Sequence, residues 1–278
     1  MKSFRSLCLV GSGPWSSKIK ASLEVAFDSS QIKVQILSAR EVLQNPRQIE
    51  TADIIWYSTW PSTQVRLASH SGNTSRTQIL EKPYGLSAKE IQSLIRLDLV
   101  NHKLFLSQVW SYSTLWREAK KVLLSERIVG IKGERIGPSN RQYIPASLDW
   151  ASHDLYLLAD LADSGQTIVN GIHISHEASG DILRNSDQTL SINVGNAAFK
   201  SCYWEITTAA RHLLKIDFLR NLLILDGKSL YLSINESSPI VSFFESTQNA
   251  SQRSGRNQTI LGIFLNCLKG SKDHVTTR

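Results

Sequence analysis

Asp149 and His153 carry side chains that can exchange protons, and they stand four residues apart. On a helix this spacing places both on one face about one turn apart, where they can converge on one hydroxyl group. A histidine with an ordinary pKa of ~6.5 can take or return that proton, and a carboxylate beside it can orient the ring. The pair therefore allows general acid/base chemistry. On spacing alone, a histidine beside Leu155 and Tyr156 is more often an ordinary structural residue.

A glycine-rich turn, Gly11-Ser-Gly13-Pro14-Trp15-Ser16, follows an apolar run and precedes a helical pattern. In that setting backbone amides can approach a pyrophosphate at a helix N-terminus. The first glycine makes the turn, the second leaves the path of the phosphate clear, and the third position, normally glycine, is Ser16. The turn predicts dinucleotide binding with a weakened fingerprint, and a plain strand-to-helix turn is the alternative.

The residues after the second apolar run indicate which dinucleotide to expect. An acidic residue there would bind the ribose hydroxyls of NAD, but the chain reads Leu37-Ser38-Ala39-Arg40. Without a carboxylate a 2′-phosphate meets no repulsion, while Ser38 can donate a hydrogen bond and Arg40 can pair with a dianion. NADP is therefore favoured over NAD, with a solvent-facing Arg40 as the alternative.

Short apolar runs alternate with helical patterns in the first third of the chain, which predicts a parallel sheet covered by helices. The predicted strands are residues 6–10, 33–37, 53–57, 77–80 and 103–109. Ser87 and Glu90 form a capping box that opens the helix between the last two. These residues, 1–110, are expected to form a dinucleotide-binding Rossmann domain.

Beyond residue 110 two helical patterns, at 115–124 and 148–161, are accompanied by β-like segments in succession. The segments are residues 167–176, 189–194, 198–207, 213–218, 221–225 and 229–234. Strands without crossover helices imply antiparallel pairing. Residues 246–259 are polar and are expected to be an exposed loop before a last helix. Residues 111–278 are therefore expected to form a C-terminal α+β domain on a mostly antiparallel sheet, making the chain an α/β protein.

In combination the motifs resemble the Gfo/Idh/MocA family of oxidoreductases. The resemblance extends over nearly the whole chain and rests on Gly11-Ser-Gly13-Pro-Trp15, Ser58-Thr59-Trp60-Pro61, Glu81-Lys82-Pro83 and Asp149-Trp-Ala-Ser-His153-Asp154. It implies NAD(P)-dependent hydride transfer to or from a carbon that bears a hydroxyl or carbonyl group.

The resemblance also implies roles for individual residues. Lys82 would lie near the nicotinamide, where a cation favours a developing alkoxide, and His153 with Asp149 would be the base for oxidation or the acid for reduction. Cofactor contacts are expected from Gly11, Gly13, Pro14, Trp15, Ser38, Arg40, Ser58, Thr59, Trp60, Gln64, Glu81 and Lys82. Gln64 stands where relatives often carry histidine, and Ser16 where they usually carry glycine.

The composition excludes several other classes. The 278 residues, 41% hydrophobic and 20% charged, suit two globular domains. The net charge of +7 comes from scattered basic residues, so no nucleic-acid partner is expected. No apolar stretch approaches the ~20 residues of a membrane span, and a cytoplasmic location is the default expectation.

No metal site is expected. Cys8, Cys202 and Cys267 are widely spaced among apolar neighbours, which predicts buried thiols without disulfides or zinc. His173 and His176 are three residues apart in a predicted strand, so their side chains should point to opposite faces.

The leading hypothesis is an oxidoreductase of a sugar, cyclitol or related polyol derivative. One alternative reduces an imine or enone with the same cofactor, and another only binds a dinucleotide. The partner expected is a small-molecule substrate. The resemblance implies, as a hypothesis, a second copy of the chain, because family relatives often pair through the open face of the C-terminal sheet. Arg135 and Arg141, in a predicted loop at 135–143, can recognise an anionic substrate group or lie in solvent.

Overall fold

The computed structural model describes residues 5–70, 76–100, 103–138, 144, 146–166, 171–177, 180–230, 232, 238–248 and 254–270. Their contacts divide the chain into two compact units. The first comprises Met1–Val109 and Ser237–Leu261, and the second comprises Trp110–Glu236 and Gly262–Arg278. The first unit is therefore discontinuous, whereas a single boundary after residue 110 was expected.

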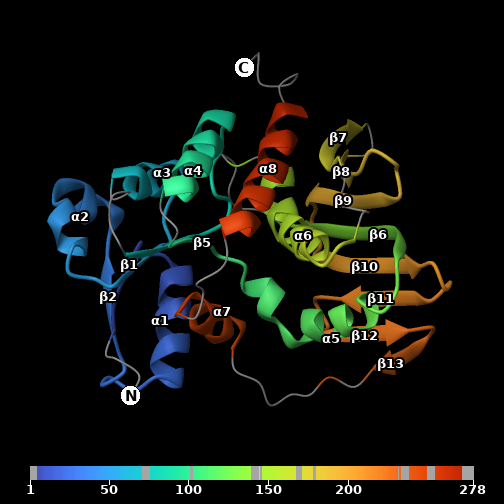
Figure 1. Cartoon of the computed structure of the whole chain (residues 1–278), viewed down its shortest axis with the longest axis horizontal. Coiled ribbons are helices and arrows are strands. Elements are labelled where there is room, and N and C mark those ends of the chain that lie inside the picture. Colours follow the sequence, from blue (N-terminus) through green and yellow to red (C-terminus); the bar gives the residue numbers. More distant parts are fainter. Residues whose placement is uncertain are drawn as a thin grey trace. The chain divides into compact units, whose positions relative to one another are not determined.

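The first unit is built on a five-stranded sheet in the order β2-β1-β3-β4-β5, with every pair parallel. The strands are β1 (Arg5–Val10), β2 (Ile32–Leu37), β3 (Ile54–Tyr57), β4 (Thr77–Leu80) and β5 (Leu104–Leu106). The helices between them are α1 (Pro14–Ala26), α2 (Ala39–Gln44), α3 (Pro61–His70) and α4 (Ala88–Val100). Figure 1 shows α3 and α4 on one side of this sheet and α1 on the other. The predicted Rossmann architecture is confirmed.

The strand order creates a switch point at the carboxyl ends of β1 and β3, because the chain leaves β1 in one direction to β2 and then crosses to β3 on its other side. Ligands of open parallel sheets bind at such points. The glycine turn follows β1, and Ser58 follows β3. The amide of Ser58 continues the ladder by donating to the carbonyl of Val10, 2.9 Å away.

The second unit contains an eight-stranded sheet in the order β13-β12-β11-β10-β6-β9-β8-β7, antiparallel except for the parallel pair β6–β9. Its strands are β6 (Ile128–Gly137), β7 (His173–Glu177), β8 (Gly180–Arg184), β9 (Leu190–Asn196), β10 (Ser201–Thr208), β11 (Leu213–Asp217), β12 (Leu222–Leu225) and β13 (Lys228–Leu230). Helices α5 (Thr114–Leu123) and α6 (Ala146–Asp163) pack on one face. Trp204 of β10 contacts both of them, through the Trp116 ring and the Asp154 carboxylate.

Strand β6 was not predicted, although it lies in the middle of the second sheet. Its sequence contains three glycines and three charged residues, a composition that disfavours strands. The tertiary structure explains one glycine directly. A Cβ atom at Gly133 would stand 2.5 Å from the carbonyl oxygen of Tyr203 and 2.9 Å from the indole of Trp204, so glycine makes room for the neighbouring strand.

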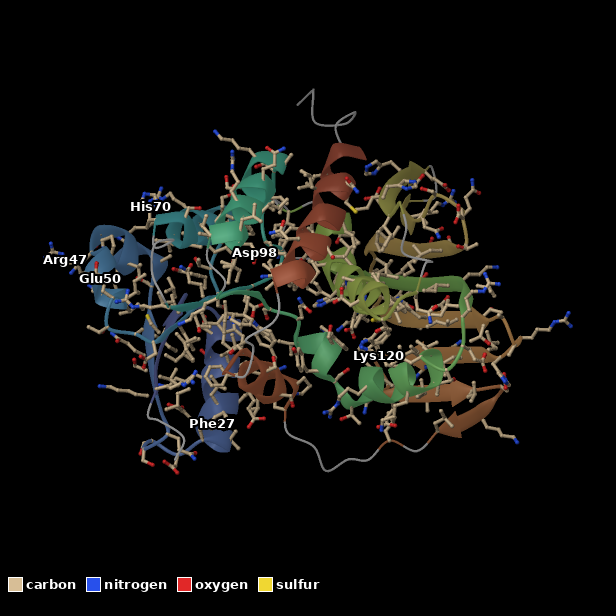
Figure 2. The ribbon with its side chains drawn as sticks, viewed as in Figure 1. Phe27, Arg47, Glu50, His70, Asp98 and Lys120 are labelled. Carbon is tan, nitrogen blue, oxygen red and sulfur yellow. The ribbon has the colours of Figure 1, made fainter. Side chains whose placement is uncertain are left out.

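The described residues of the segment 246–259 are helical, contrary to the expected exposed loop. It contains the end of α7 (Pro239–Gln248) and the start of α8 (Ser254–Gly270). Asn257 is buried and donates to the Asp98 carboxylate at 2.6 Å and to the carbonyl of Leu104 at 2.7 Å. Figure 2 labels Asp98. The polar composition of this segment predicted a solvated loop. The prediction failed because the partners of Asn257 lie far away in the sequence and cannot be read from the segment itself.

Helix α7 completes the apolar core of the first unit. Phe243 and Phe244 are buried, and their rings lie 5.5 Å and 6.4 Å from the ring of Trp56. Phe244 also meets Phe27 edge to face at 5.8 Å, and α7 lies beside α1 in Figure 1. Within the described ranges, no helix is both long and apolar enough to cross a membrane.

Candidate functional site

The two glycines of the turn after β1 differ in what a side chain would meet at each position. Gly11 has φ +140°, and a Cβ atom there would stand 2.1 Å from the carbonyl oxygen of Ser58. The fold itself therefore requires glycine at this position. Gly13 has an ordinary φ of −81°, and a Cβ atom there would meet nothing within 4 Å. No described protein atom requires glycine at position 13, and the open space beside it leaves room for a ligand.

The N-terminus of α1 suits an anion. Gly13 is its N-cap and supplies no side-chain cap, and the first turn contains no acidic residue. The amides of that turn and the positive end of the helix dipole therefore face the glycine turn. Pro14 at the first helical position lacks only an N–H group that the helix does not use. Ser16 is fully buried beneath this turn, so a serine fits where glycine is usual.

Trp15 follows the glycine turn on α1 and is half-buried. Its indole Nε1 is buried and has no hydrogen-bond acceptor among the described residues. The ammonium group of Lys18 lies 5.4 Å from the centre of its ring. The uncapped helix, the open space at Gly13 and this donor together fit the pyrophosphate of a dinucleotide.

Ser38 begins helix α2 as one half of a capping box. Its hydroxyl accepts a hydrogen bond from the amide of Glu41 at 3.2 Å, and the Glu41 carboxylate accepts one from the amide of Ser38 at 2.7 Å. These hydrogen bonds lower the pKa of the Glu41 carboxyl. An ionised carboxylate is therefore present close after β2, where the sequence analysis found none. Arg40 is exposed on the same turn, and the preference for NADP remains a prediction.

Ser58, Thr59 and Trp60 form the short connection from β3 to α3. Ser58 and Thr59 are half-buried, and Trp60 is 37% exposed. These side chains lie at the same carboxyl edge of the sheet as the glycine turn. A partly exposed tryptophan at this edge offers a flat apolar surface to a planar ligand.

The turn after β4 presents Lys82 and holds its neighbours inside the protein. Among residues 81–85, Lys82 is the one side chain that is not buried. The Glu81 carboxylate accepts a hydrogen bond from the indole of Trp56 at 2.9 Å. The peptide bond between Lys82 and Pro83 is cis. Glu81 therefore supports the turn from within.

Gln64 was expected to contact the cofactor, but its side chain is fully buried. Its Nε2 donates to the carbonyl oxygens of Glu81 and Pro83 at 2.6 Å and 2.9 Å, and its Oε1 accepts from the amide of Glu81 at 3.1 Å. The whole carboxamide is engaged by the backbone on both sides of Lys82. Gln64 therefore supports the turn that presents Lys82, and its contact with a cofactor stays a prediction.

In the second unit, Asp149 and His153 lie one turn apart on α6, as their spacing predicted. Asp149 is 8% exposed and His153 is half-buried. The His153 ring meets Trp110 edge to face, with 5.5 Å between ring centres. Trp110 in turn meets Phe218 at 5.9 Å. His153 is therefore held in an aromatic setting that the sequence analysis did not identify.

Arg135 was expected in a loop, where it would bind an anionic substrate group or lie in solvent. The structure places it in a strand and buries it. It lies in β6, is 2% exposed, and its Nε donates to the Asp154 carboxylate at 2.7 Å. Burial raises the pKa of the Asp154 carboxyl, and the guanidinium opposes that rise. The guanidinium carbon of Arg135 lies 5.7 Å from the Trp110 ring centre. Arg141 falls outside the described residues.

The remaining polar candidates have structural explanations. Cys8, Cys202 and Cys267 are buried free thiols, and burial raises the pKa of Cys8 to about 11 and those of Cys202 and Cys267 to about 12. His176 bonds to Asp181 at 2.6 Å across the β7–β8 pair. In the described part of the chain, no group of three or more His, Cys, Asp or Glu side chains is placed to hold a metal ion.

Comparison with known proteins gives a structural result. No protein-family model and no curated protein sequence matches the chain significantly. Solved structures do match it. UDP-N-acetylglucosamine 3-dehydrogenase GnnA from Acidithiobacillus ferrooxidans has a TM-score of 0.72 at 14% identity, covering 97% of this chain and 98% of that one.

Two further structures are similar in the same way. The apo scyllo-inositol dehydrogenase from Lactobacillus casei has a TM-score of 0.65 at 14% identity, covering 98% of this chain and 97% of that one. A Gfo/Idh/MocA family oxidoreductase from Vibrio cholerae has a TM-score of 0.67 at 10% identity, with 98% of each chain covered. The resemblance that the motifs indicated is thus confirmed as a shared fold.

Proposed function

We propose that this chain, which has the fold of the Gfo/Idh/MocA family oxidoreductases, is an NAD(P)-dependent oxidoreductase. Its substrate would be a sugar, a cyclitol or a related polyol derivative, and the reacting carbon would bear a hydroxyl or carbonyl group. Two proteins of similar fold are dehydrogenases of a nucleotide sugar and of an inositol, which supports this substrate class.

The observation that carries the proposal is the grouping of three features at one edge of the parallel sheet. The glycine turn follows β1, the segment from Ser58 to Trp60 follows β3, and the turn that presents Lys82 follows β4. Gly13 leaves room for a pyrophosphate, and the exposed part of Trp60 offers a surface to a ring. An ammonium group at the same edge adds a cation where charge would develop.

The chain's own residues would move the proton and stabilise the charge. A nicotinamide cofactor, when bound, would supply the hydride acceptor for oxidation and the hydride donor for reduction. In oxidation His153 would take the hydroxyl proton, with Asp149 one turn away on the same helix. Lys82 stabilises the oxygen as negative charge develops on it. In reduction His153 returns the proton to that oxygen.

Nucleotide titration with matched glycine variants tests the cofactor site. Purified protein is titrated with NADPH and NADH while nicotinamide fluorescence is followed. Gly13→Ser should weaken nucleotide binding about tenfold or more, because the side chain enters the space of the pyrophosphate. It should keep the unfolding midpoint at or above that of the parent, because serine is a favoured N-cap.

Gly11→Ala is the opposite control, since its Cβ atom would clash with Ser58. It should lower stability by more than ~1 kcal/mol. Wild-type protein that binds neither nucleotide would overturn the oxidoreductase proposal, and Gly13→Ser with unchanged affinity would remove the ligand explanation of Gly13. Tight binding without turnover of any polyol would favour the imine or enone reductase, or the non-catalytic dinucleotide-binding protein.

A further inference from the structure

We propose that Gln64 is a positioning residue for Lys82. Its carboxamide fixes the backbone on both sides of that lysine and so sets where the ammonium group is presented. The catalytic meaning of this role rests on the proposed function of Lys82, but the positioning itself is a property of the turn and can be measured without a substrate.

The hydrogen bonds of Gln64 bracket Lys82. They bind the amide and carbonyl of Glu81 before it, at 3.1 Å and 2.6 Å, and the carbonyl of Pro83 after it, at 2.9 Å. The Gln64 side chain has no exposed surface, so water cannot replace these bonds. The backbone at Lys82 is thereby held at both of its neighbours.

A carboxamide is the group that this arrangement requires. The Glu81 amide needs an acceptor, and the two carbonyl oxygens need donors, and glutamine supplies both from one planar group. Glutamate at this position would place a carboxylate oxygen against two carbonyl oxygens. Leucine would remove the donor to the buried carbonyls of Glu81 and Pro83 and would leave the Glu81 amide with the Tyr57 carbonyl alone, which is costly in a dry interior.

Further hydrogen bonds hold the backbone around the turn. Glu81 also donates its amide to the carbonyl of Tyr57 at 3.2 Å, and the Tyr84 hydroxyl donates to the carbonyl of Ser107 at 3.0 Å. Pro83 is buried, and Lys82 is half-buried. The turn sets where the Cα atom of Lys82 lies, and Gln64 binds that turn directly on both sides of the lysine.

Hydrogen exchange and lysine labelling on the full chain test the proposal. In Gln64→Leu and Gln64→Glu, peptides covering residues 81–86 should exchange their amides about tenfold faster or more than in the wild type. The rate at which an acylating reagent modifies Lys82, followed by mass spectrometry across pH, should change by several-fold. The exposed lysines Lys33 and Lys200 serve as internal references and should keep their rates.

Asn257→Leu is the matched control. Asn257 is also a buried amide in the first unit and donates to the carbonyl of Leu104, at the amino end of β5 and hence at the opposite edge of the sheet. The control should lower the free energy of unfolding without changing the rate at which Lys82 is labelled. Gln64→Glu keeps an acceptor for the Glu81 amide. If Gln64→Leu does not fold, the exchange and labelling rates are measured in Gln64→Glu.

Wild-type labelling of Lys82 in both Gln64 variants, or an equal change in Asn257→Leu, would overturn the positioning role. Nucleotide titration of the wild type tests the proposed function independently of the labelling experiment. A protein that binds no nicotinamide nucleotide would remove the proposed function, while the labelling result would still decide what Gln64 does.

Discussion

Single residues at the carboxyl edge of the first sheet divide into those that support and those that are presented. Gln64, Glu81 and Gly11 are buried and in contact with the protein itself. Gly13 adjoins open space, and Trp60 and Lys82 are partly exposed. Residue type alone does not separate the two groups, because the difference depends on which atoms lie opposite each side chain.

The predicted cofactor preference depends at this scale on Arg40 and Glu41. Arg40→Ala should lower NADPH affinity about tenfold and leave NADH affinity nearly unchanged, because the lost cation pairs with a 2′-phosphate. Glu41→Gln should shift the preference toward NADPH, because it removes a negative charge while glutamine can keep the capping box. Fluorescence titrations at low ionic strength measure both. Equal losses for the two nucleotides would exclude Arg40 as the discriminating residue.

Glu41 shows what the sequence could have supplied. The Ser-x-x-Glu signature that identifies the start of α4 at Ser87, confirmed by both of its hydrogen bonds, is equally present at Ser38. Gln64 gives no such signal, because its partners lie 17 and 19 positions away in the chain. Local patterns reveal local hydrogen bonds, and the long-range ones appear only when the sheet is assembled.

At the scale of elements, the pairing of β6 with α6 depends on one buried ion pair. Arg135 of β6 and Asp154 of α6 are almost fully buried, and Trp204 also donates to Asp154 at 2.8 Å. The neighbouring residue on α6 is His153. The ion pair therefore helps to fix the helix that carries the proposed acid/base residues.

Arg135→Met should destabilise the protein by about 3–5 kcal/mol, because it leaves the Asp154 carboxylate buried without its cation. The double variant Arg135→Met with Asp154→Leu should recover much of that loss, since apolar residues of similar size can replace a buried pair. Urea unfolding of the two single variants and the double variant gives the coupling free energy. Strictly additive losses would show that the two residues do not act as a pair.

The elements with clear periodicity could be predicted from the sequence. The first four strands and helix α6 lie within a few residues of their expected bounds. Strand β6 could not be predicted, because Arg135 occupies a core position and its partner on α6 cannot be read from the strand. The start of α8 was missed for the same reason, since Asn257 and Gln258 bind a carboxylate far away in the chain.

At the scale of the whole molecule, the first unit depends on residues that are distant in sequence from its sheet. Phe244→Ala should lower the free energy of unfolding by about 3–5 kcal/mol, because it leaves a cavity beside Trp56 and Phe27. Phe199→Ala is the matched control, since Phe199 is 64% exposed, and it should change stability by less than ~0.5 kcal/mol. Unfolding curves followed by tryptophan fluorescence compare them. Similar values for both would show that α7 is dispensable to that core.

Helix α8 contributes to both cores, since Asn257 binds Asp98 in the first unit and Phe264 packs on Tyr156 in the second, with 6.3 Å between ring centres. A protein whose domains follow one another along the chain can fold each domain as it leaves the ribosome. Here the sheet of the first unit is translated early, but its covering residues emerge only after the whole second sheet. Completion of either unit therefore waits until α8 has been translated, and until then the early sheet lacks the residues of α7 and α8 that cover it.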